Sequence, residues 1–514
     1  MLGLKGRDAA SVWLDGALVF DEAGGPRPRE QARVDLGRGL HSVRAEFRSR
    51  ESLPVFKLTL TSATGEPVGT VFPNRPSRST RALVTVLLAL RRVLPAALVL
   101  GLLLGWSVAL RFEAPRLRWL LVLLLVLYSG SLRLESVVRQ YWGLAAPAWA
   151  RQVTALVSEL RPSALKLPPK DRPYAGDPSS YLRYARAMEH FYDAHAREPL
   201  FVAATKAGLA LAGGADIGIS LASTVFSTLM VLALYLLGAE CFGHAAGLLA
   251  ALLLAIEPQV IGLAPEGWRD EAFSLFVLLT CLGLVRLQTR PSFAGALGVG
   301  MAGGLACLTR ITSLSFLIPA LLYLCLGDEG AAGAARRRAA ALASIVALAL
   351  IAPYLASCAI AFGDPFLAIN THTGFYRSRA GLPAETGMSW GQYLATSFGP
   401  VDLVRKMVVG RTIYPFANKW LPYTLWLPGL ATVLRVSSLV GLVLFLKRRQ
   451  GRLLLVVLFA ALLPFAFTWD ITGGREWRLT LVAYPFYLLA AAFAADCAVT
   501  FLRARGTRRG AAAS

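Results

Sequence analysis

A small group of carboxylates stands beside apolar segments of the chain. Asp177 begins "DPSSYLRYA", and Glu266, Asp270 and Glu271 lie in the short stretch "APEGWRDEAF" between two apolar runs. So short a connection between long apolar segments keeps its side chains near the membrane surface. A carboxylate there can take the proton of an attacking hydroxyl group. Purely structural roles also fit, since Asp177 before Pro178 suits a helix N-cap. Acids such as Asp270 and Glu271 also stabilise the first turn of a helix.

Arginines accompany these acids. Arg269 directly precedes Asp270, and Arg475 and Arg478 lie in "GGREWRLTLVAYPF" before the last apolar run. Guanidinium groups bind phosphate in a bidentate geometry. Acids and arginines at one membrane face therefore suit an anionic, lipid-linked substrate. Interfacial anchoring is the alternative role for Arg475 and Arg478.

Arg310 interrupts two short apolar segments in "LACLTRITSLSFLIP". An arginine in hydrocarbon is costly unless it faces water or an anion. We expect its partner to be either Glu257, an acid inside another apolar run, or the phosphate of a lipid-linked substrate. Glu257 itself is a functional candidate by its position, or it marks a solvated kink before Pro258.

No soluble-enzyme motif competes with these residues. The acids are too sparse to specify a metal, so a divalent ion is possible and no cofactor is certain. The six cysteines lie in or beside apolar runs without metal-ligand spacing. The glycine-rich "GALGVGMAGG" follows no strand, so it predicts close helix packing rather than a phosphate-binding loop.

The composition indicates a polytopic membrane protein. The 514 residues are 55% hydrophobic, with a mean hydropathy of +0.54. Apolar runs of about 16 residues or more recur, most of them long enough to cross a bilayer. The eleven predicted spans lie near residues 93–110, 118–134, 217–238, 244–263, 272–287, 293–308, 312–327, 339–360, 427–446, 452–468 and 478–502.

Arginine clusters predict the orientation. The net charge of +22 is concentrated in short connections between spans. With eleven spans, these clusters fall on one face, which the positive-inside rule assigns to the cytoplasm. The clusters are at residues 111–118, 286–290, 336–338, 447–452 and 503–509. Arg91 and Arg92 do not fit this arrangement, because they would lie at the outer end of the first predicted span. They therefore argue against the span at 93–110. Nucleic-acid binding is not expected, because no basic helix is interleaved with aromatic residues.

Residues 1–80 read as short strands with turns, which predicts a small β-sandwich domain on the extracytoplasmic side. No export signal precedes this domain in the sequence. We expect the chain to be the later part of a longer one, with export by the first span as the alternative. Residues 181–195 place aromatics at helical spacing, which predicts an amphipathic helix lying in the membrane interface.

Residues 118–502 resemble the GT-C superfamily of polytopic glycosyltransferases. The match is to the clan of dolichyl-phosphate-mannose-protein mannosyltransferases and aminoarabinose transferases. The resemblance depends on the order of "GDPSSYLRYA", "REPLF", "WRDEAF", "GLACLTRITSLSFLIP", "FGDPFLAINTH" and "REWRLTLVAYPFYLL". It implies an inverting transfer of a sugar from a polyprenyl-phosphate donor to an acceptor glycan, lipid or protein at the extracytoplasmic face. Membrane lipid and this donor are the implied partners.

The resemblance also implies roles for residues. Asp177 matches the catalytic acid of the first outer loop, and Asp270 matches the acid of the second. Substrate binding is implied for Arg310 and the last-loop arginines, and we expect the same of Arg269, Glu266 and Glu271. Two features depart from the clan: Pro178 stands where a second acid is common, and the 93–110 span is extra.

Residues 8–70 resemble part of a protective-antigen-type β-domain, through "ASVWLDGALVFDEAGG" and "LGRGLHSVRAEF". Such domains often bind glycans, but the calcium-binding acidic pair is not visible, so a spacer role is equally open. The expected organisation is 1–80 β-domain, 81–117 extra span and loop, 118–502 GT-C-like domain and 503–514 basic cytoplasmic tail.

Two other functions are considered. A transporter or flippase for polyprenyl-linked sugars usually has internal repeats with paired interrupted helices, and the sequence has one interrupted pair without an obvious repeat. A non-catalytic glycan sensor leaves acids at the span ends unexplained. We therefore expect a glycosyltransferase in the cell membrane, with its C-terminus in the cytoplasm.

Overall fold

The computed structural model of the chain describes residues 2–6, 10–20, 30–32, 43–47, 56–60, 115–142, 174, 176–326, 330–372, 401, 430–466 and 477–513. The chain divides into two compact units, residues 1–83 and 84–514. The predicted span at 93–110 and the predicted site residue Arg475 lie outside the described residues.

The first unit contains two antiparallel three-stranded sheets, with strand orders β4-β1-β6 and β3-β2-β5. The strands are β1 Leu2–Gly6, β2 Ala10–Leu14, β3 Ala17–Phe20, β4 Glu30–Ala32, β5 Val43–Phe47 and β6 Phe56–Leu60. Asp15 and Gly16 join β2 to β3 with φ of 51° and 86°, which suits a type I′ hairpin. The predicted strands and Asp-Gly turn are therefore present. A sandwich packing and glycan binding stay predictions.

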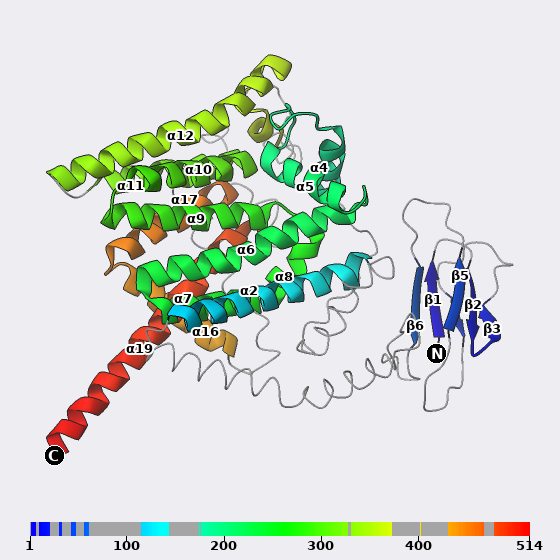
Figure 1. Ribbon diagram of the computed structural model, residues 1–514, viewed down its shortest axis with the longest axis horizontal. Coiled ribbons are helices and arrows are strands. Elements are labelled where there is room, and N and C mark those ends of the chain that lie inside the picture. Colours follow the sequence, from blue (N-terminus) through cyan, green and yellow to red (C-terminus); the bar gives the residue numbers. More distant parts are fainter. Residues whose placement is uncertain are drawn as a thin grey trace. The chain divides into compact units, whose positions relative to one another are not determined.

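The second unit is helical (Figure 1). Its longer helices are α2 Pro115–Val137, α6 Ile217–Phe242, α9 Asp270–Thr289, α10 Phe293–Thr309, α12 Ala331–Phe362, α17 Arg449–Ala466 and α19 Tyr484–Ala513. The shorter ones are α4 Asp177–Ala187, α5 Pro199–Leu211, α7 His244–Ala255, α8 Pro258–Leu263, α11 Leu314–Cys325 and α16 Leu430–Phe445.

Within the described ranges, five helices are long and apolar enough to cross a membrane, or six if a bent pair is counted as one span. The bent pair is α7 with α8 and the turn that follows, at an angle of 49°. Helices α10 and α11, predicted as two short spans, are separate apolar helices on either side of Arg310. The polytopic helical fold is thus confirmed, while the count of eleven spans stays a prediction.

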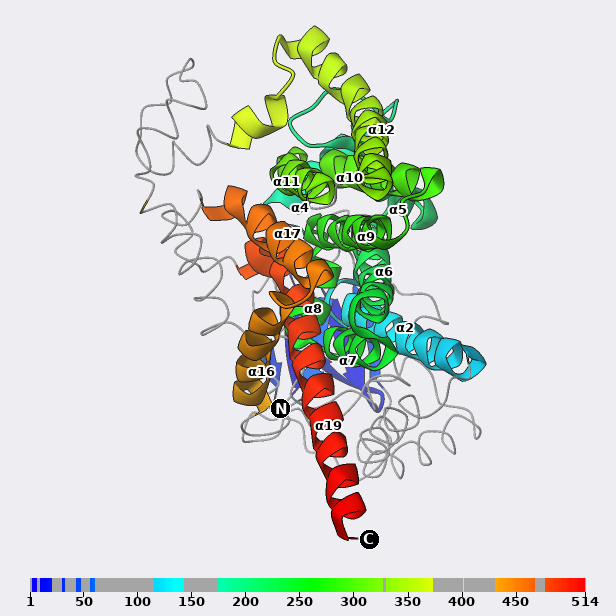
Figure 2. The ribbon, with the colours of Figure 1, turned by 90° about the vertical axis from the view of Figure 1, so that its left-hand side faces the viewer.

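The helices are stacked side by side, in the order α12, α10, α9 and α6, with α7 and α2 beyond α6 (Figures 1 and 2). Glycines permit the close approach of α10 to α12. A Cβ added to Gly300 would lie 2.6 Å from the Cβ of Val346, and one added to Gly304 would lie 2.8 Å from the Cδ1 of Leu350. The predicted packing role of this glycine-rich segment is confirmed.

At the break between α7 and α8, two charged side chains form hydrogen bonds with backbone groups. The Arg133 guanidinium, in α2, donates to the carbonyls of Ala255 at 3.1 Å and Leu254 at 3.3 Å. The Glu257 carboxylate accepts the amide of Val260 at 2.8 Å and so caps α8. Both side chains are completely buried. Glu257 therefore has a capping role inside the bundle, and the solvated-kink interpretation is wrong.

Helix α4 ends at Ala187, so the predicted amphipathic helix does not continue to residue 195. Its inward face packs on protein: Tyr181 is buried, with its ring centroid 5.1 Å from that of Phe201 in α5. Met188, just after the helix, is buried in the same cluster. The interfacial interpretation is thus wrong for these side chains, because α5 supplies the apolar partner that the membrane was expected to provide.

Candidate active site

Seven charged side chains meet near the first residues of α4, α5 and α9. They are the carboxylates of Asp177, Glu198 and Asp270 and the guanidinium groups of Arg197, Arg269, Arg310 and Arg478. Helix α9 supplies Asp270 as its first residue, and Arg310 separates α10 from α11. Arg478 belongs to the 3₁₀ segment Trp477–Ala483, before α19. We call this set the charged cluster.

Asp177 is the first residue of α4, and the N-cap of this helix is Gly176, with φ of 80°. No side-chain capping bond forms at this helix start. The carboxylate instead accepts a hydrogen bond from Arg197 Nη2 at 2.7 Å, and its second oxygen lies 3.8 Å from Arg478 Nη2. The N-cap interpretation of Asp177 is therefore wrong, and its carboxylate belongs to the charged cluster.

Asp270 accepts from two arginines. Arg310 Nη2 donates to its Oδ1 at 2.8 Å, and Arg478 Nη1 donates to its Oδ2 at 3.3 Å. The side chain of Asp270 is 3% exposed. Arg310 thus pairs with Asp270, and neither partner expected from the sequence, Glu257 or a lipid phosphate, is needed to explain its charge.

Glu198 and Arg197 are site residues that sequence reasoning missed. Glu198 precedes α5, and its buried carboxylate accepts from Arg269 Nη1 and from the backbone amide of Ile311 at 2.8 Å. The signal was present, because both residues belong to "REPLF". That motif was recognised for its place in the chain, but its two charges received no role.

His372 is a second hydrogen-bond partner of the Arg197 guanidinium, besides Asp177. Its Nδ1 lies 2.8 Å from the carbonyl of Ala368, so this nitrogen donates there and Nε2 is free to accept from Arg197 Nη1 at 2.8 Å. Burial lowers the pKa of His372 to about 4, with Arg269 and Arg197 adding to the effect. A neutral imidazole is therefore the form that can accept from Arg197 near neutral pH.

The acids of the charged cluster outside the spans are ionised near neutral pH. Burial acts to raise the pKa of Asp177, but Arg197, Arg478 and Arg269 together hold it below its ordinary value. The pKa of Glu198 is also lowered, because Arg269 and other partners outweigh the opposing effect of burial. A carboxylate held in this form can accept a proton.

Three arginines of the charged cluster each have one N–H group without a hydrogen-bond partner among the described residues. The Nε groups of Arg197, Arg269 and Arg310 are buried and have no hydrogen-bond partner among the residues that the structure describes. Four guanidinium groups face three carboxylates, so the charged cluster is also positive overall. Both features suit an anionic ligand.

The other predicted site residues are placed as follows. Glu266 accepts from the indole Nε1 of Trp268 at 2.7 Å, and the guanidinium of Arg478 lies 3.8 Å from the centroid of that indole ring. Glu266 therefore touches the charged cluster through Trp268. Glu271 is completely buried, and neither of its carboxylate oxygens has a hydrogen-bond partner within the described ranges.

The described residues offer a poor fit to a divalent metal. No three His, Cys, Asp or Glu side chains gather in this part of the chain as a ligand set. The three acids of the charged cluster are each paired with an arginine. A divalent metal therefore stays, as from the sequence alone, a possibility without a ligand set among the described residues.

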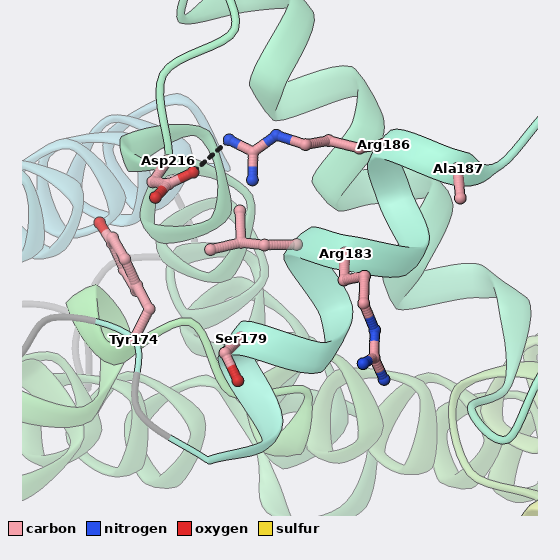
Figure 3. Close-up of a pocket in the computed structure, with 7 residues that line it drawn as sticks. Tyr174, Ser179, Arg183, Arg186, Ala187 and Asp216 are labelled. Atoms are coloured by element: carbon pink, nitrogen blue, oxygen red, sulfur yellow. Dashed lines mark hydrogen bonds and ion pairs between the residues drawn. The ribbon is translucent and has the colours of Figure 1, made fainter. Parts of the chain in front are cut away.

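A separate open pocket of about 650 Å³ lies against α4 (Figure 3). The residues of α4 that line it are on the face of the helix opposite to Asp177. Tyr174, Ser179, Arg183, Arg186 and Asp216 are among its lining residues, and Arg186 forms an ion pair with Asp216. Asp177 is not among the lining residues. The pocket and the charged cluster are thus distinct features of the same short helix.

Residues 195–356 match the family model described as dolichyl-phosphate-mannose-protein mannosyltransferase. The matched range includes Glu198, Arg269, Asp270 and Arg310, whereas Asp177 and Arg478 lie outside it. A comparison with curated proteins finds no match.

Solved structures similar to the chain include the archaeal oligosaccharyltransferase AglB from Archaeoglobus fulgidus, in complex with an inhibitory peptide and a dolichol-phosphate. That alignment has 16% identity and a TM-score of 0.47 and covers 77% of this chain and 52% of that chain. A structure of the Archaeoglobus fulgidus oligosaccharyltransferase with Zn and sulfate aligns with 16% identity and a TM-score of 0.43, covering 73% of this chain and 53% of that chain. This chain thus spans about half the length of these proteins, and with TM-scores below 0.5 the assignment depends on the family match. The family match over residues 195–356 confirms the resemblance predicted from the sequence, which is to membrane glycosyltransferases of the GT-C superfamily.

Proposed function

We propose that this protein transfers a sugar from a polyprenyl-phosphate donor to an acceptor at the extracytoplasmic face of the cell membrane, with inversion at the anomeric carbon. The observation that carries the proposal is the charged cluster. Two carboxylates, Asp177 and Asp270, share Arg478 and stand among arginines with unused donors. A proton acceptor beside anion-binding groups is what this reaction requires.

The position of the charged cluster supports the extracytoplasmic side. Asp270 is the first residue of α9, whereas Arg286 lies in the last turn of the same helix and pairs there with Glu240, near the end of α6. The arginines 336–338 lie near the beginning of α12. By the positive-inside rule these clusters are cytoplasmic, and the far end of α9 then lies outside. The same rule places the C-terminus in the cytoplasm.

The donor is proposed from the anion-binding groups and from the family. Proteins of the family that matches residues 195–356 are named for dolichyl-phosphate-mannose. A phosphodiester that arrives from the bilayer would meet Arg310 and Arg478 at the ends of apolar helices. Guanidinium groups bind phosphate oxygens in pairs and do not lose their charge in proteins.

The proposed chemical step is a single displacement. The hydroxyl oxygen of the acceptor attacks the anomeric carbon and forms the new glycosidic bond, while the bond from this carbon to the donor phosphate oxygen breaks. The hydroxyl proton passes to Asp177, and the electron pair of the broken bond stays on the polyprenyl phosphate. The arginines stabilise the negative charge that develops there. The acceptor is a glycan, lipid or protein with a nucleophilic hydroxyl group.

One experiment tests this function against a transporter or a glycan sensor. Purified protein in proteoliposomes receives polyprenyl-phosphate donors that carry a radiolabelled sugar, together with candidate acceptors. We expect cleavage of the donor and appearance of label in an acceptor or in water. A transporter would move the intact donor between leaflets, and a sensor would leave the donor unchanged. Either result, with a donor panel that covers hexoses and pentoses, would contradict the proposed function.

A further inference from the structure

Arg310 is held by its backbone neighbours as well as by its side chain. It lies in extended conformation, with φ of −157° and ψ of 106°, between α10 and α11. The carbonyl of Thr309, one residue before, accepts from Arg269 Nη1 at 3.1 Å. The amide of Ile311, one residue after, donates to Glu198 Oε1 at 2.8 Å. Both peptide groups that flank Arg310 are thus fixed by other segments.

These contacts form a closed ring. Glu198 uses its second oxygen, Oε2, to accept from Arg269. Arg269 is followed in the chain by Asp270, whose Oδ1 accepts from the side chain of Arg310. The ring therefore runs from Glu198 through Arg269, Asp270 and Arg310 to the Ile311 amide and back to Glu198. Its four side chains are 10% exposed or less.

We propose that Glu198 is a positioning residue for the donor-binding arginine Arg310, through its simultaneous hold on Arg269 and on the Ile311 amide. This inference rests on the proposed function, in which Arg310 binds the donor phosphate. Arg310 has a long side chain with many rotamers, and ordering such a side chain costs free energy. The fixed backbone on both sides of Arg310 and the hydrogen bond from its side chain to Asp270 together reduce the freedom of the guanidinium before the donor arrives.

The charge of Glu198 matters as well as its shape. A Gln at position 198 keeps an oxygen that can accept from the Ile311 amide, but it no longer neutralises Arg269. Hydrogen bonds to a carboxylate are about twice as strong as those to a neutral acceptor. Glu198→Gln therefore loosens the ring without removing it. Glu198→Ala removes both bonds and leaves Arg269 unpaired and buried, so this variant has a higher risk of misfolding.

The test is a double-mutant cycle with Glu198→Gln, Arg310→Gln and the double variant. Displacement of a binding group by about 1 Å can cost ~10²-fold. We expect Glu198→Gln to raise the KM for the donor by about 10-fold and to lower kcat/KM by about 10²-fold. A loss of folded protein alone lowers kcat and leaves KM unchanged. If Glu198 acts through Arg310, the double variant is within about 3-fold of Arg310→Gln, because coupled residues are not additive.

Glu240→Gln is the matched control, since it also breaks a Glu–Arg ion pair. This is the pair of Glu240 and Arg286, at 3.0 Å, near the C-terminal end of α6. We expect its KM and kcat to be those of the wild type. Two kinetic results overturn the proposal: an unchanged donor KM in folded Glu198→Gln, or effects that multiply in the double variant. In either case a wild type that cleaves the donor leaves the proposed function intact.

A second measurement needs no donor. Hydrogen–deuterium exchange of a peptide that contains Ile311 reports its amide bond to Glu198. We expect faster exchange there in Glu198→Gln than in Glu240→Gln. If the wild type cleaves no donor, the proposed function fails, and this measurement still decides whether Glu198 holds the Arg310 segment. Equal exchange in the two variants overturns the positioning role.

Discussion

Arg478 and Asp270 are 208 positions apart in the sequence, yet Arg478 Nη1 lies 3.3 Å from Asp270 Oδ2. The other terminal nitrogen of Arg478 lies 3.8 Å from Asp177. One guanidinium thus joins an acid at the start of α4 to an acid at the start of α9. The guanidinium carbon of Arg478 also lies 3.8 Å from the ring centroid of Trp268, over the face of the indole, in a cation–π contact.

Asp177→Asn tests the proposed base. The substitution keeps the size of the side chain and removes the proton acceptor, so we expect turnover of the donor to fall by about 10²–10⁴-fold. Folding should be largely retained, because Asn keeps an oxygen that can accept from Arg197 and the side chain of Asp177 is 27% exposed. Transfer of radiolabelled sugar per mole of monodisperse protein measures the effect.

The control for this variant is Asp216→Asn. Asp216 pairs with Arg186 at the pocket on the opposite face of α4, so the change removes another Asp–Arg ion pair nearby. We expect this variant to retain wild-type turnover. Full activity of folded Asp177→Asn would show that this carboxylate is not the base.

Asp270 and Glu271 form a natural comparison, as neighbouring acids in the first turn of α9. Asp270 pairs with Arg310 and Arg478, whereas Glu271 has no hydrogen-bond partner among the described residues. Removal of one partner from a buried ion pair typically costs ~3–5 kcal/mol. We therefore expect Asp270→Asn to lower both thermal stability and donor turnover, the latter by about 10²-fold.

For Glu271→Gln we expect turnover within about 3-fold of the wild type, because a carboxylate outside the ion-pair network contributes little to substrate placement. Thermal unfolding and transfer assays on the two variants provide the comparison. Equal losses of activity in both would show that Glu271 binds substrate, as the sequence predicted.

The sequence was informative where a signal is local. Apolar runs predicted the long helices, and acids beside span ends singled out Asp177 and Asp270, which both contact Arg478 in the structure. Their meeting at Arg478 could not be derived, because it depends on how helices far apart in sequence pack together. The arginine was predicted only as an anchor or a phosphate ligand.

Sequence patterns were misleading where two structural explanations share one signature. Asp-Pro at residue 177 suits a helix N-cap, but the conformation of Gly176 gives the capping position to that glycine instead. The aromatics around Tyr181 suit a membrane interface, but they pack on α5, a helix that was not predicted. Its apolar stretch of 13 residues is too short to be recognised as a span.

His372 predicts a pH dependence of stability. Its pKa in the fold is about 4, against an ordinary value of 6.5. Between these values the unfolded chain binds a proton that the folded chain does not, so stability falls as the pH decreases from 6.5 to 4. The loss approaches about 3 kcal/mol at most. Burial also lowers the pKa of His195, which contributes in the same direction.

Thermal unfolding of the wild type and of His372→Gln between pH 4 and 7 isolates this contribution. We expect the variant to lose less stability on acidification, because Gln does not titrate and can still accept from Arg197. Asp177 and Glu198, whose pKa values are lowered in the fold, lose their stabilising effect as the pH falls through their ordinary values of 3.8 and 4.5, and this loss is common to both proteins. Parallel curves for the two proteins would contradict the assignment to His372.

The orientation can be tested with cysteines at two exposed positions. Glu189 lies after α4, and Arg337 lies near the beginning of α12. An impermeant thiol reagent applied to intact cells should label Glu189→Cys and not Arg337→Cys, if the charged cluster faces outward. Permeabilised cells provide the control, since both positions should then react. Labelling of Arg337→Cys in intact cells would reverse the proposed sidedness.

Arg310→Ala separates a structural from a substrate-binding role for this arginine. The guanidinium pairs with Asp270 and lies 4.8 Å from the ring centroid of Phe465. Asp270 keeps Arg478 as a partner after the substitution, so no acid of the charged cluster is left without a counter-charge. We therefore expect Arg310→Ala to fold and its KM for the donor to rise by about 10-fold, as the loss of roughly 1.4 kcal/mol of phosphate binding implies.

Arg310→Lys sharpens the interpretation. Lysine restores a point charge but not the planar fork that holds Asp270 and a phosphate together, so we expect only partial recovery of the donor KM. Direct binding of polyprenyl phosphate to the purified variants gives the same order without catalysis: wild type tightest, Lys intermediate and Ala weakest. If folded Arg310→Ala binds the donor as tightly as the wild type, Arg310 only neutralises Asp270, and the phosphate must be held by Arg478 and its neighbours.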